Sequence, residues 1–279
     1  MHVSHADHGG AVEWWLLPVF VVIGCVVGFL AGLLGIGGGM TIVPLLTLIF
    51  TREHFPEEHI LHMAIATSMA TIVFTSISSV RAHHALDAVL WPVFWRLAPG
   101  MLVGSFVGPQ VVGGMSTTLL SGVFAAFAGF IATSMLFDRK PKPTRELPGP
   151  AGLFGSGVVI GMVASVVGAG GGFLSVPLMT ACNVRIRNAV GTSAALGLPI
   201  AAAGTVGFIV AGLRQTGLPP YTVGFIYLPG LIAIVAASIV VAPIGARLSH
   251  RWPVAYLRRA FACLLYAVAA FFLWKAIGR

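Results

Sequence analysis

GIGGGMTIVP at Gly35–Pro44 and GAGGGFLSVP at Gly168–Pro177 are two versions of one motif, placed 133 residues apart in a chain of 279. Three successive glycines break a helix, because each costs about 1 kcal/mol relative to alanine in a helix interior and admits positive φ angles. Both motifs lie in strongly apolar sequence. Irregular backbone survives at membrane depth only where it is buried in protein or lines a cavity. The two breaks are therefore candidate sites.

The composition around the motifs indicates a membrane protein. Hydrophobic residues make up 57% of the chain and charged residues only 9%, against roughly 25% charged residues in an ordinary soluble domain. About 20 apolar residues cross a bilayer. Candidate spans of that kind are 16–34 continuing to 50, 60–80, 92–112, 117–137, 152–182, 189–212, 222–245 and 254–274. Only short loops remain, so we expect an all-α, polytopic membrane protein without a soluble domain.

The resemblance between the halves extends beyond the glycine motifs. AIATSM at 64–69 corresponds to AVGTSA at 189–194, and LAPGML at 97–102 corresponds to YLPGLI at 227–232. The sequence therefore predicts two homologous four-segment repeats, at 1–138 and 151–279. A charged, proline-rich linker at 139–150 joins them.

The distribution of Lys and Arg distinguishes two arrangements of the glycine-broken segments. If every segment crosses once, the sixteen cations divide nine against seven. If each glycine motif is instead the tip of a re-entrant hairpin, they divide twelve against four, which satisfies the positive-inside rule. Three crossings per half also make the repeats inverted, as in many secondary transporters. A single discontinuous helix in each half remains the alternative.

The residues after each break predict an anion site. Pro44 and Pro177 suit the first turn of new short helices at about 41–50 and 174–182. A helix N-terminus offers unpaired N–H donors and partial positive charge, which favour an anion. Hydroxyls on the following helix could donate to an oxyanion, or bond back to a carbonyl one turn earlier. The candidate substrate-binding residues are Gly37, Gly38, Gly39, Thr41, Pro44, Thr67, Ser68, Gly170, Gly171, Gly172, Ser175, Pro177, Thr192 and Ser193.

Other features narrow the class of protein. All eight carboxylates lie in the tail, in loops or at span ends, which disfavours a cation carrier with intramembrane Asp or Glu. No nucleophile has a neighbouring base, and the three cysteines share no motif, so we expect no enzyme, metal or cofactor. The cations act as topology signals, so nucleic acid is not a predicted partner. Glycines four residues apart, at Gly24, Gly28 and Gly32 and at Gly100, Gly104 and Gly108, predict close helix packing.

A resemblance to a known family is carried by GFLAGLLGIGGGMTIVPLL, GMVASVVGAGGGFLSVPLM, the paired ATS and GTS elements and the run from GLPPYTVGFIYLPGL to VAYLRRAF. Through these stretches the chain resembles the sulfite exporter TauE/SafE family of membrane permeases. The resemblance implies a multi-pass carrier of the bacterial inner membrane for sulfite, sulfoacetate or other organosulfonates, driven by the proton gradient. It also implies that the glycine runs, their prolines and the Thr-Ser pairs line the path.

The residues themselves support only a small anion as substrate and the lipid bilayer as partner. A channel-like anion pore and a membrane-embedded assembly factor remain alternatives. Which anion is carried, in which direction, with which coupling ion and in which oligomeric state, including a homo-oligomer, all stay open.

Overall fold

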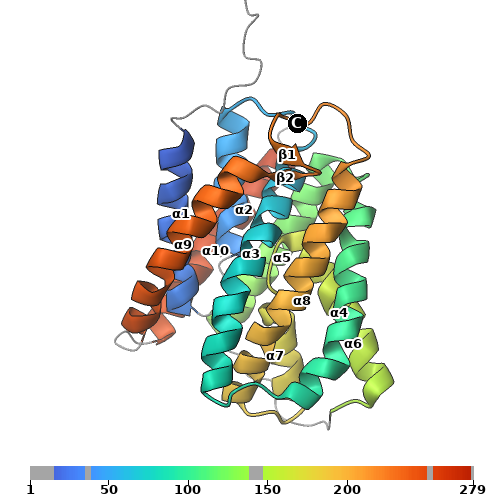
Figure 1. Ribbon diagram of the computed structural model, residues 1–279, viewed down its shortest axis with the longest axis vertical. Coiled ribbons are helices and arrows are strands. Elements are labelled where there is room, and N and C mark those ends of the chain that lie inside the picture. Colours follow the sequence, from blue (N-terminus) through green and yellow to red (C-terminus); the bar gives the residue numbers. More distant parts are fainter. Residues whose placement is uncertain (1–15, 35–38, 138–146, 250–253, 278–279) are drawn as a thin grey trace, which may run out of the picture.

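The computed structural model describes residues 16–34, 39–137, 147–249 and 254–277, which form ten helices and one β-hairpin. The helices before the linker are α1 (Leu16–Leu34), α2 (Gly39–Arg52), α3 (Ile60–Ala85), α4 (Trp91–Val112) and α5 (Thr117–Phe137). Those after it are α6 (Pro150–Val167), α7 (Gly172–Ala181), α8 (Ile186–Gly212), α9 (Leu228–Ser249) and α10 (Val254–Ile277). The elongated bundle has an upper end, with the hairpin and the loop from α2 to α3, and a lower end, with the loops from α3 to α4 and from α7 to α8 (Figure 1).

Helices α1 and α2 both reach the upper end, since α1 runs down from it and α2 runs back up (Figure 1). Aromatic contacts agree with this path: the ring of Tyr227, just before α9, lies 5.9 Å from that of Phe20 in α1 and 5.7 Å from that of Phe50 in α2. Helices α6 and α7 form the opposite arrangement, since α6 runs up from the lower end and α7 returns to it (Figure 1). Both helix pairs therefore turn inside the bundle.

Two glycine-lined seams join the first part of the chain to the second. Helix α1 packs along α9, and α4 packs along α6. A Cβ atom at Gly24 or Gly28 would collide with the backbone of α9, and one at Gly100 or Gly104 would collide with the backbone of α6. This close approach confirms the predicted packing role of these glycines and of Gly108; the surroundings of Gly32 lie outside the described residues. In the centre α3 packs against α8, and α2 and α7 lie against α3 and α8 respectively.

Three predicted boundaries change in the structure. The break predicted within 152–182 separates α6 from α7, but both short helices begin two residues earlier than expected, at Gly39 and Gly172. Pro44 and Pro177 consequently fall in the second turn of each helix, not the first, where the missing N–H leaves the carbonyls of Met40 and Phe173 without their helical partner.

The third change concerns the segment predicted at 222–245, which begins as a β-hairpin of β1 (Thr222–Val223) and β2 (Ile226–Tyr227). The reason is local, because Gly224 turns the chain at φ +57° and presses against the backbone of Ile209, where no side chain fits. Helix α9 therefore begins only at Leu228.

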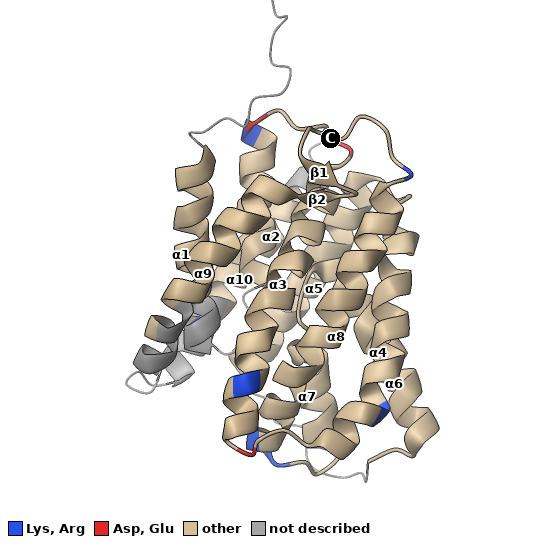
Figure 2. Cartoon of the chain, in the orientation of Figure 1, with Lys and Arg blue, Asp and Glu red and all other residues tan. Residues whose placement is uncertain are grey.

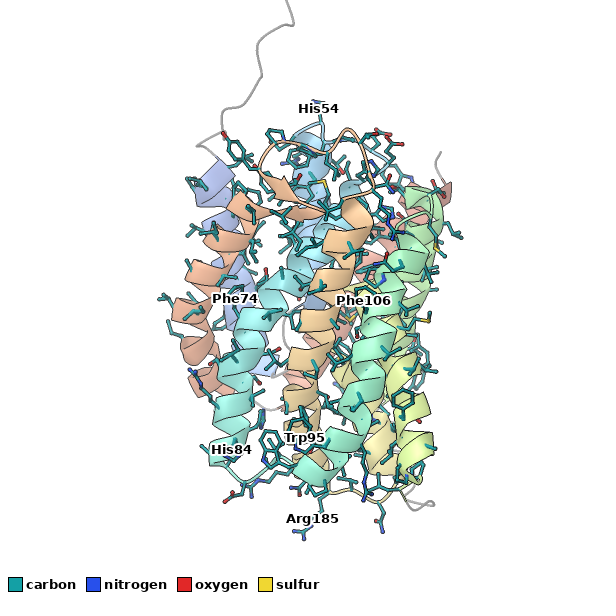
Figure 3. The ribbon with its side chains drawn as sticks, turned by 45° about the vertical axis from the view of Figure 1, so that its right-hand side comes forward. His54, Phe74, His84, Trp95, Phe106 and Arg185 are labelled. Atoms are coloured by element: carbon teal, nitrogen blue, oxygen red, sulfur yellow. The ribbon has the colours of Figure 1, made fainter. Side chains whose placement is uncertain are left out.

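The surface is consistent with a bilayer around the bundle. Four of the described helices, α3, α5, α6 and α8, are long and apolar enough to cross a membrane. Large apolar side chains such as Phe74 and Phe106 point outward between the two ends (Figure 3). Arginines lie toward the two ends of the bundle (Figure 2). Arg52 closes α2 and Arg214 follows α8 at the upper end, whereas Arg81 lies near the end of α3, Arg96 near the start of α4, and Arg185 and Arg187 at the start of α8, all at the lower end. This grouping is the one expected for these six residues if each glycine motif is the tip of a re-entrant hairpin, which stays a prediction.

Candidate functional site

The second glycine motif forms a defined turn between α6 and α7. Helix α6 ends in a Schellman arrangement, in which Gly168 adopts φ +69° and the N–H of Ala169 donates to the Ala164 carbonyl at 2.9 Å. Gly171 then adopts φ +72° as the residue preceding α7. Both conformations are costly for any residue with a side chain. The motif therefore needs glycine at its first and fourth positions for backbone reasons.

This turn leaves several amides unused. Within the described residues, the N–H groups of Gly170, Gly171, Gly172 and Phe173 have no hydrogen-bond acceptor, whereas those of Leu174 and Ser175 donate to the Gly171 carbonyl. Gly170 also has open space beside it, because a Cβ atom there would meet only Ile72, at 3.9 Å. The first turn of α7 thus presents free donors and the positive end of its dipole to the centre of the bundle.

The first motif meets the second at this point. A Cβ atom at Gly39 would overlap the carbonyl oxygen of Gly168, so the two backbones touch. Ser68 of α3 lies between them, with its Oγ 3.1 Å from the Gly39 carbonyl and 3.2 Å from the Gly168 carbonyl. One hydroxyl proton is therefore shared by both breaks, and α2 and α7 run away from this point in opposite directions.

A second hydroxyl pair lies on the α7 side of the site. Ser175 and Ser193 are both buried, with their Oγ atoms 2.7 Å apart, and Ser175 Oγ also lies 3.0 Å from the Gly171 carbonyl. Because a carbonyl can only accept, Ser175 donates to Gly171 and Ser193 donates to Ser175. Ser193 also lies next to Gly172, where a Cβ atom would be 3.2 Å from the Ser193 Oγ. The pair stands beside the free amides of α7.

Thr41, in the first turn of α2, supplies a hydroxyl near the first glycine break. Its side chain is buried, and its Oγ1 has no hydrogen-bond partner within the described part of the chain. Threonines deeper in the helices behave differently, since Thr47 and Thr71 bond back to the carbonyls of Val43 and Thr67. Gly37 and Gly38, predicted with Gly39 as site residues, lie outside the described residues.

Thr67 and Thr192 use their hydroxyls differently from either predicted role. Thr67 Oγ1 accepts the N–H of Tyr227 at 3.1 Å, just before α9, and Thr192 Oγ1 accepts the N–H of Leu90 at 2.8 Å, just before α4. Each threonine thus ties its own half to the start of a helix in the other half. Pro44 is buried in α2, whereas Pro177 is exposed on α7.

The family model described as sulfite exporter TauE/SafE matches residues 20–272, which is most of the chain. The chain belongs to the sulfite exporter TauE/SafE family. The match begins within α1 and ends within α10, so it includes α2 to α9, both glycine motifs and both threonine ties.

Relatives of this TauE/SafE protein are named as transporters. A probable membrane transporter protein of Haemophilus influenzae is 36% identical over 250 residues, covering 89% of this chain and 95% of the relative. One of Methanocaldococcus jannaschii is 28% identical over 269 residues, covering 92% and 96%. Bacillus subtilis YdhB, with the same description, is 26% identical over 250 residues, covering 87% and 94%. No solved structure matches the chain significantly. Family and relatives support a membrane location.

Sequence reasoning missed one polar residue of this TauE/SafE protein. His62 is 1% exposed in the first turn of α3, and its Nδ1 has no hydrogen-bond partner within the described residues. A lone histidine at the start of an apolar segment carries no pattern in the sequence. Only the packing of α4, α8 and the hairpin around α3 makes it a buried polar group.

Proposed function

We propose that this protein is a secondary transporter of the bacterial inner membrane that carries small sulfur-containing anions, such as sulfite, sulfoacetate or other organosulfonates, with the proton gradient as driving force. The observation that carries the proposal is the meeting of the two glycine breaks at Ser68. There, free amides at the start of α7 offer a cradle for an oxyanion in the interior of a membrane protein.

The surrounding charges favour an anion over a cation. Among the described residues, carboxylates occur only at Glu53, Glu57, Glu58 and Asp87, all of them in loops. A metal ion or ammonium group in the centre would lack a negative partner there, whereas an anion is matched by amides and hydroxyls. The family name, which refers to sulfite export, adds the sulfur chemistry that the residues do not supply.

The arrangement also favours alternating access over an open pore. We propose that residues 1–138 and 151–279 are inverted repeats joined by the linker 139–150, because α1 with α2 opens to the upper end and α6 with α7 to the lower end. Transporters with broken helices bind their substrates where such repeats meet. The candidate path is formed by Gly39, Thr41 and Ser68 with Gly170–Gly172, Ser175 and Ser193.

Purified protein in liposomes tests the proposal. Vesicles are loaded in parallel with sulfite, sulfate, acetate, thiosulfate and a simple alkyl sulfonate, and counterflow of the labelled anion is measured against its concentration. We expect saturable exchange for sulfite or the sulfonate and little for acetate. Flux without saturation or counterflow would indicate a channel. Absence of anion movement in every case would remove transport altogether and favour an assembly role.

Ser193→Ala provides a matched variant for this assay, with Ser78→Ala as control, because Ser78 is exposed on α3. Ser193→Ala removes the hydroxyl beside the α7 amides but leaves the bond from Ser175 to Gly171. We expect a weaker apparent affinity for the anion, by about tenfold to a hundredfold, since one hydrogen bond to a charged group contributes on the order of 1.5–3 kcal/mol. Equal affinities for both variants would move the anion away from Ser193.

A further inference from the structure

The upper end of the bundle contains a buried histidine enclosed by aromatic rings. His62 lies beneath the β-hairpin, where its ring stacks on Phe225 with centroids 5.2 Å apart and an interplanar angle of 23°. The ring of Phe208 in α8 lies edge-on to that of Phe225, with centroids 6.4 Å apart. The ring of His59 also lies 6.4 Å from that of His62. The imidazole is therefore held by α3, α8 and the hairpin, away from solvent.

The hydrogen bonding of His62 fixes its tautomer. Its Nε2 lies 2.8 Å from the carbonyl oxygen of Val112, at the end of α4. Because a carbonyl only accepts, Nε2 carries the hydrogen, and in the neutral ring Nδ1 is left as a lone-pair acceptor. Nδ1 makes no hydrogen bond in the described part of the chain, and the backbone carbonyl of Glu58, one helical turn earlier, is the neutral acceptor that a proton on the ring would face. An unpaired buried polar atom in a native fold needs an explanation, and in this tautomer Nδ1 is the ring nitrogen of His62 to which a proton can add.

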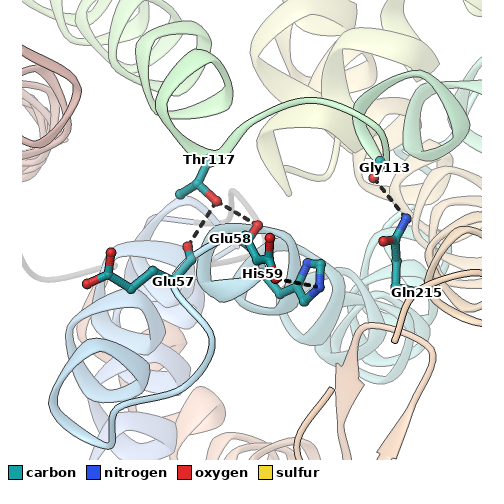
Figure 4. Close-up of polar contacts among 6 residues, drawn as sticks. All are labelled: Glu57, Glu58, His59, Gly113, Thr117 and Gln215. Carbon is teal, nitrogen blue, oxygen red and sulfur yellow. Dashed lines mark hydrogen bonds and ion pairs between the residues drawn. The ribbon is translucent and has the colours of Figure 1, made fainter. Parts of the chain in front are cut away.

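Among the described residues, no carboxylate is paired with His62 to balance a proton on Nδ1. Glu58, one helical turn earlier, has a side chain that is 80% exposed and lies 3.9 Å from the neighbouring His59. Figure 4 draws this Glu58–His59 pair together with two neutral contacts near it: Thr117 of α5 donates to the carbonyls of Glu57 and Glu58, and Gln215 donates to that of Gly113. Val112, Phe208 and Phe225 face the ring from α4, α8 and the hairpin without charge. Within the described residues a buried imidazolium there has no carboxylate partner, so an anion bound nearby would stabilise it.

The face of α3 that carries His62 leads to the glycine breaks. Ile65, three residues on, would touch a Cβ atom at Gly168, and Ile72 would touch one at Gly39 or Gly170. Helical spacing places His62, Ile65 and Ile72 on one face of α3. At 1.5 Å of rise per residue, His62 stands roughly 9 Å above the level of Ser68. An anion held at the breaks is therefore close enough to act through a low-dielectric interior.

We propose that His62 carries the proton that accompanies the anion. Nδ1 takes up a proton from the aqueous phase to which the site is open when the anion binds at the breaks, and returns it to the other aqueous phase when the anion leaves. Each charge makes the other less costly to bury, so the two are bound together and lost together. The inference rests on the proposed function and adds to it the residue and nitrogen atom that link anion to proton.

Proton uptake on anion binding tests the inference without measuring transport. The purified full-length protein in a weakly buffered detergent solution is titrated with methanesulfonate, whose charge is constant near neutral pH, and protons taken up are counted against anion bound. The test variant is His62→Gln, whose amide N–H can still reach the Val112 carbonyl but cannot take up a proton. The control is His59→Gln, because His59 is the neighbouring ring and has its own acid.

We expect wild type and His59→Gln to take up about one proton per bound anion near pH 7, and His62→Gln to bind the anion more weakly without uptake. Uptake by His62→Gln equal to that of wild type would overturn the inference. Failure of wild type to bind any of the five anions would instead overturn the proposed function. If His62→Gln does not fold, wild type decides alone: its affinity must fall about tenfold from about pH 5.5 to about pH 8, and a constant affinity overturns the inference.

Discussion

Gly171 requires glycine for two separate reasons. Its φ of +72° is strained for a residue with a side chain, and an added Cβ atom would collide with Cδ1 of Ile200. Gly170, immediately before it, has no positive φ and has space for a methyl group. The sequence shows three successive glycines without distinguishing them, and only the backbone conformation shows that they have different roles. A glycine run predicts a break, but not which member makes the turn and which presents the open amides.

Replacing each glycine by alanine separates these two roles. We expect Gly171→Ala to lower the free energy of unfolding by about 1–3 kcal/mol, because the left-handed backbone is strained and Ile200 must move. We expect Gly170→Ala to change it by less than about 0.5 kcal/mol. Thermal unfolding of the two purified variants in detergent measures the difference. Equal melting temperatures would show that the turn at Gly171 differs from the one described.

At the scale of helices, most elements could be predicted from apolar length, but the starts of α2, α7 and α9 could not. The hairpin before α9 depends on Gly224 packing against α8, which is a tertiary contact. In the same way, Thr67 and Thr192 were predicted on the correct helices, yet the amides that donate hydrogen bonds to their hydroxyls belong to residues 160 and 102 positions away. Hydroxyl partners at such separations leave no local pattern in a sequence.

The seam between α4 and α6 gives a prediction at this scale. Gly104→Ala places a methyl group against the Val158 carbonyl, so the two helices must separate. We expect a loss of stability of roughly 1–3 kcal/mol, as for other overpacked contacts. Gly122→Ala on α5 is the matched control, since nothing lies within 4 Å of its added Cβ atom. Melting temperatures of both variants check the prediction, which is wrong if Gly104→Ala unfolds at the same temperature as Gly122→Ala.

At the scale of the whole molecule, the arginine distribution predicts which loops share a side of the membrane. Arg52 ends α2 at the upper end, and Arg185 precedes α8 at the lower end. In a variant whose Cys25, Cys182 and Cys263 are replaced by alanine, Arg52→Cys and Arg185→Cys are labelled with a membrane-impermeant maleimide. We expect Arg52→Cys to react only from outside the cell and Arg185→Cys only from the cytoplasm, by the positive-inside rule. Labelling of both from one side would contradict the hairpin path of α1 and α2.

The seams and threonine ties described above interleave the two halves of the chain. Helix α1 lies along α9, α4 lies along α6, and each threonine holds an amide from across the linker. Pulling residues 1–138 away from 151–279 would open both seams and both ties at once. A rigid body that preserves these contacts must therefore contain helices from both halves. One such body is built around α1 with α9, and the other around α4 with α6. In the proposed alternating access, we expect two such bodies to move against each other at the crossing of α3 and α8, not at the linker.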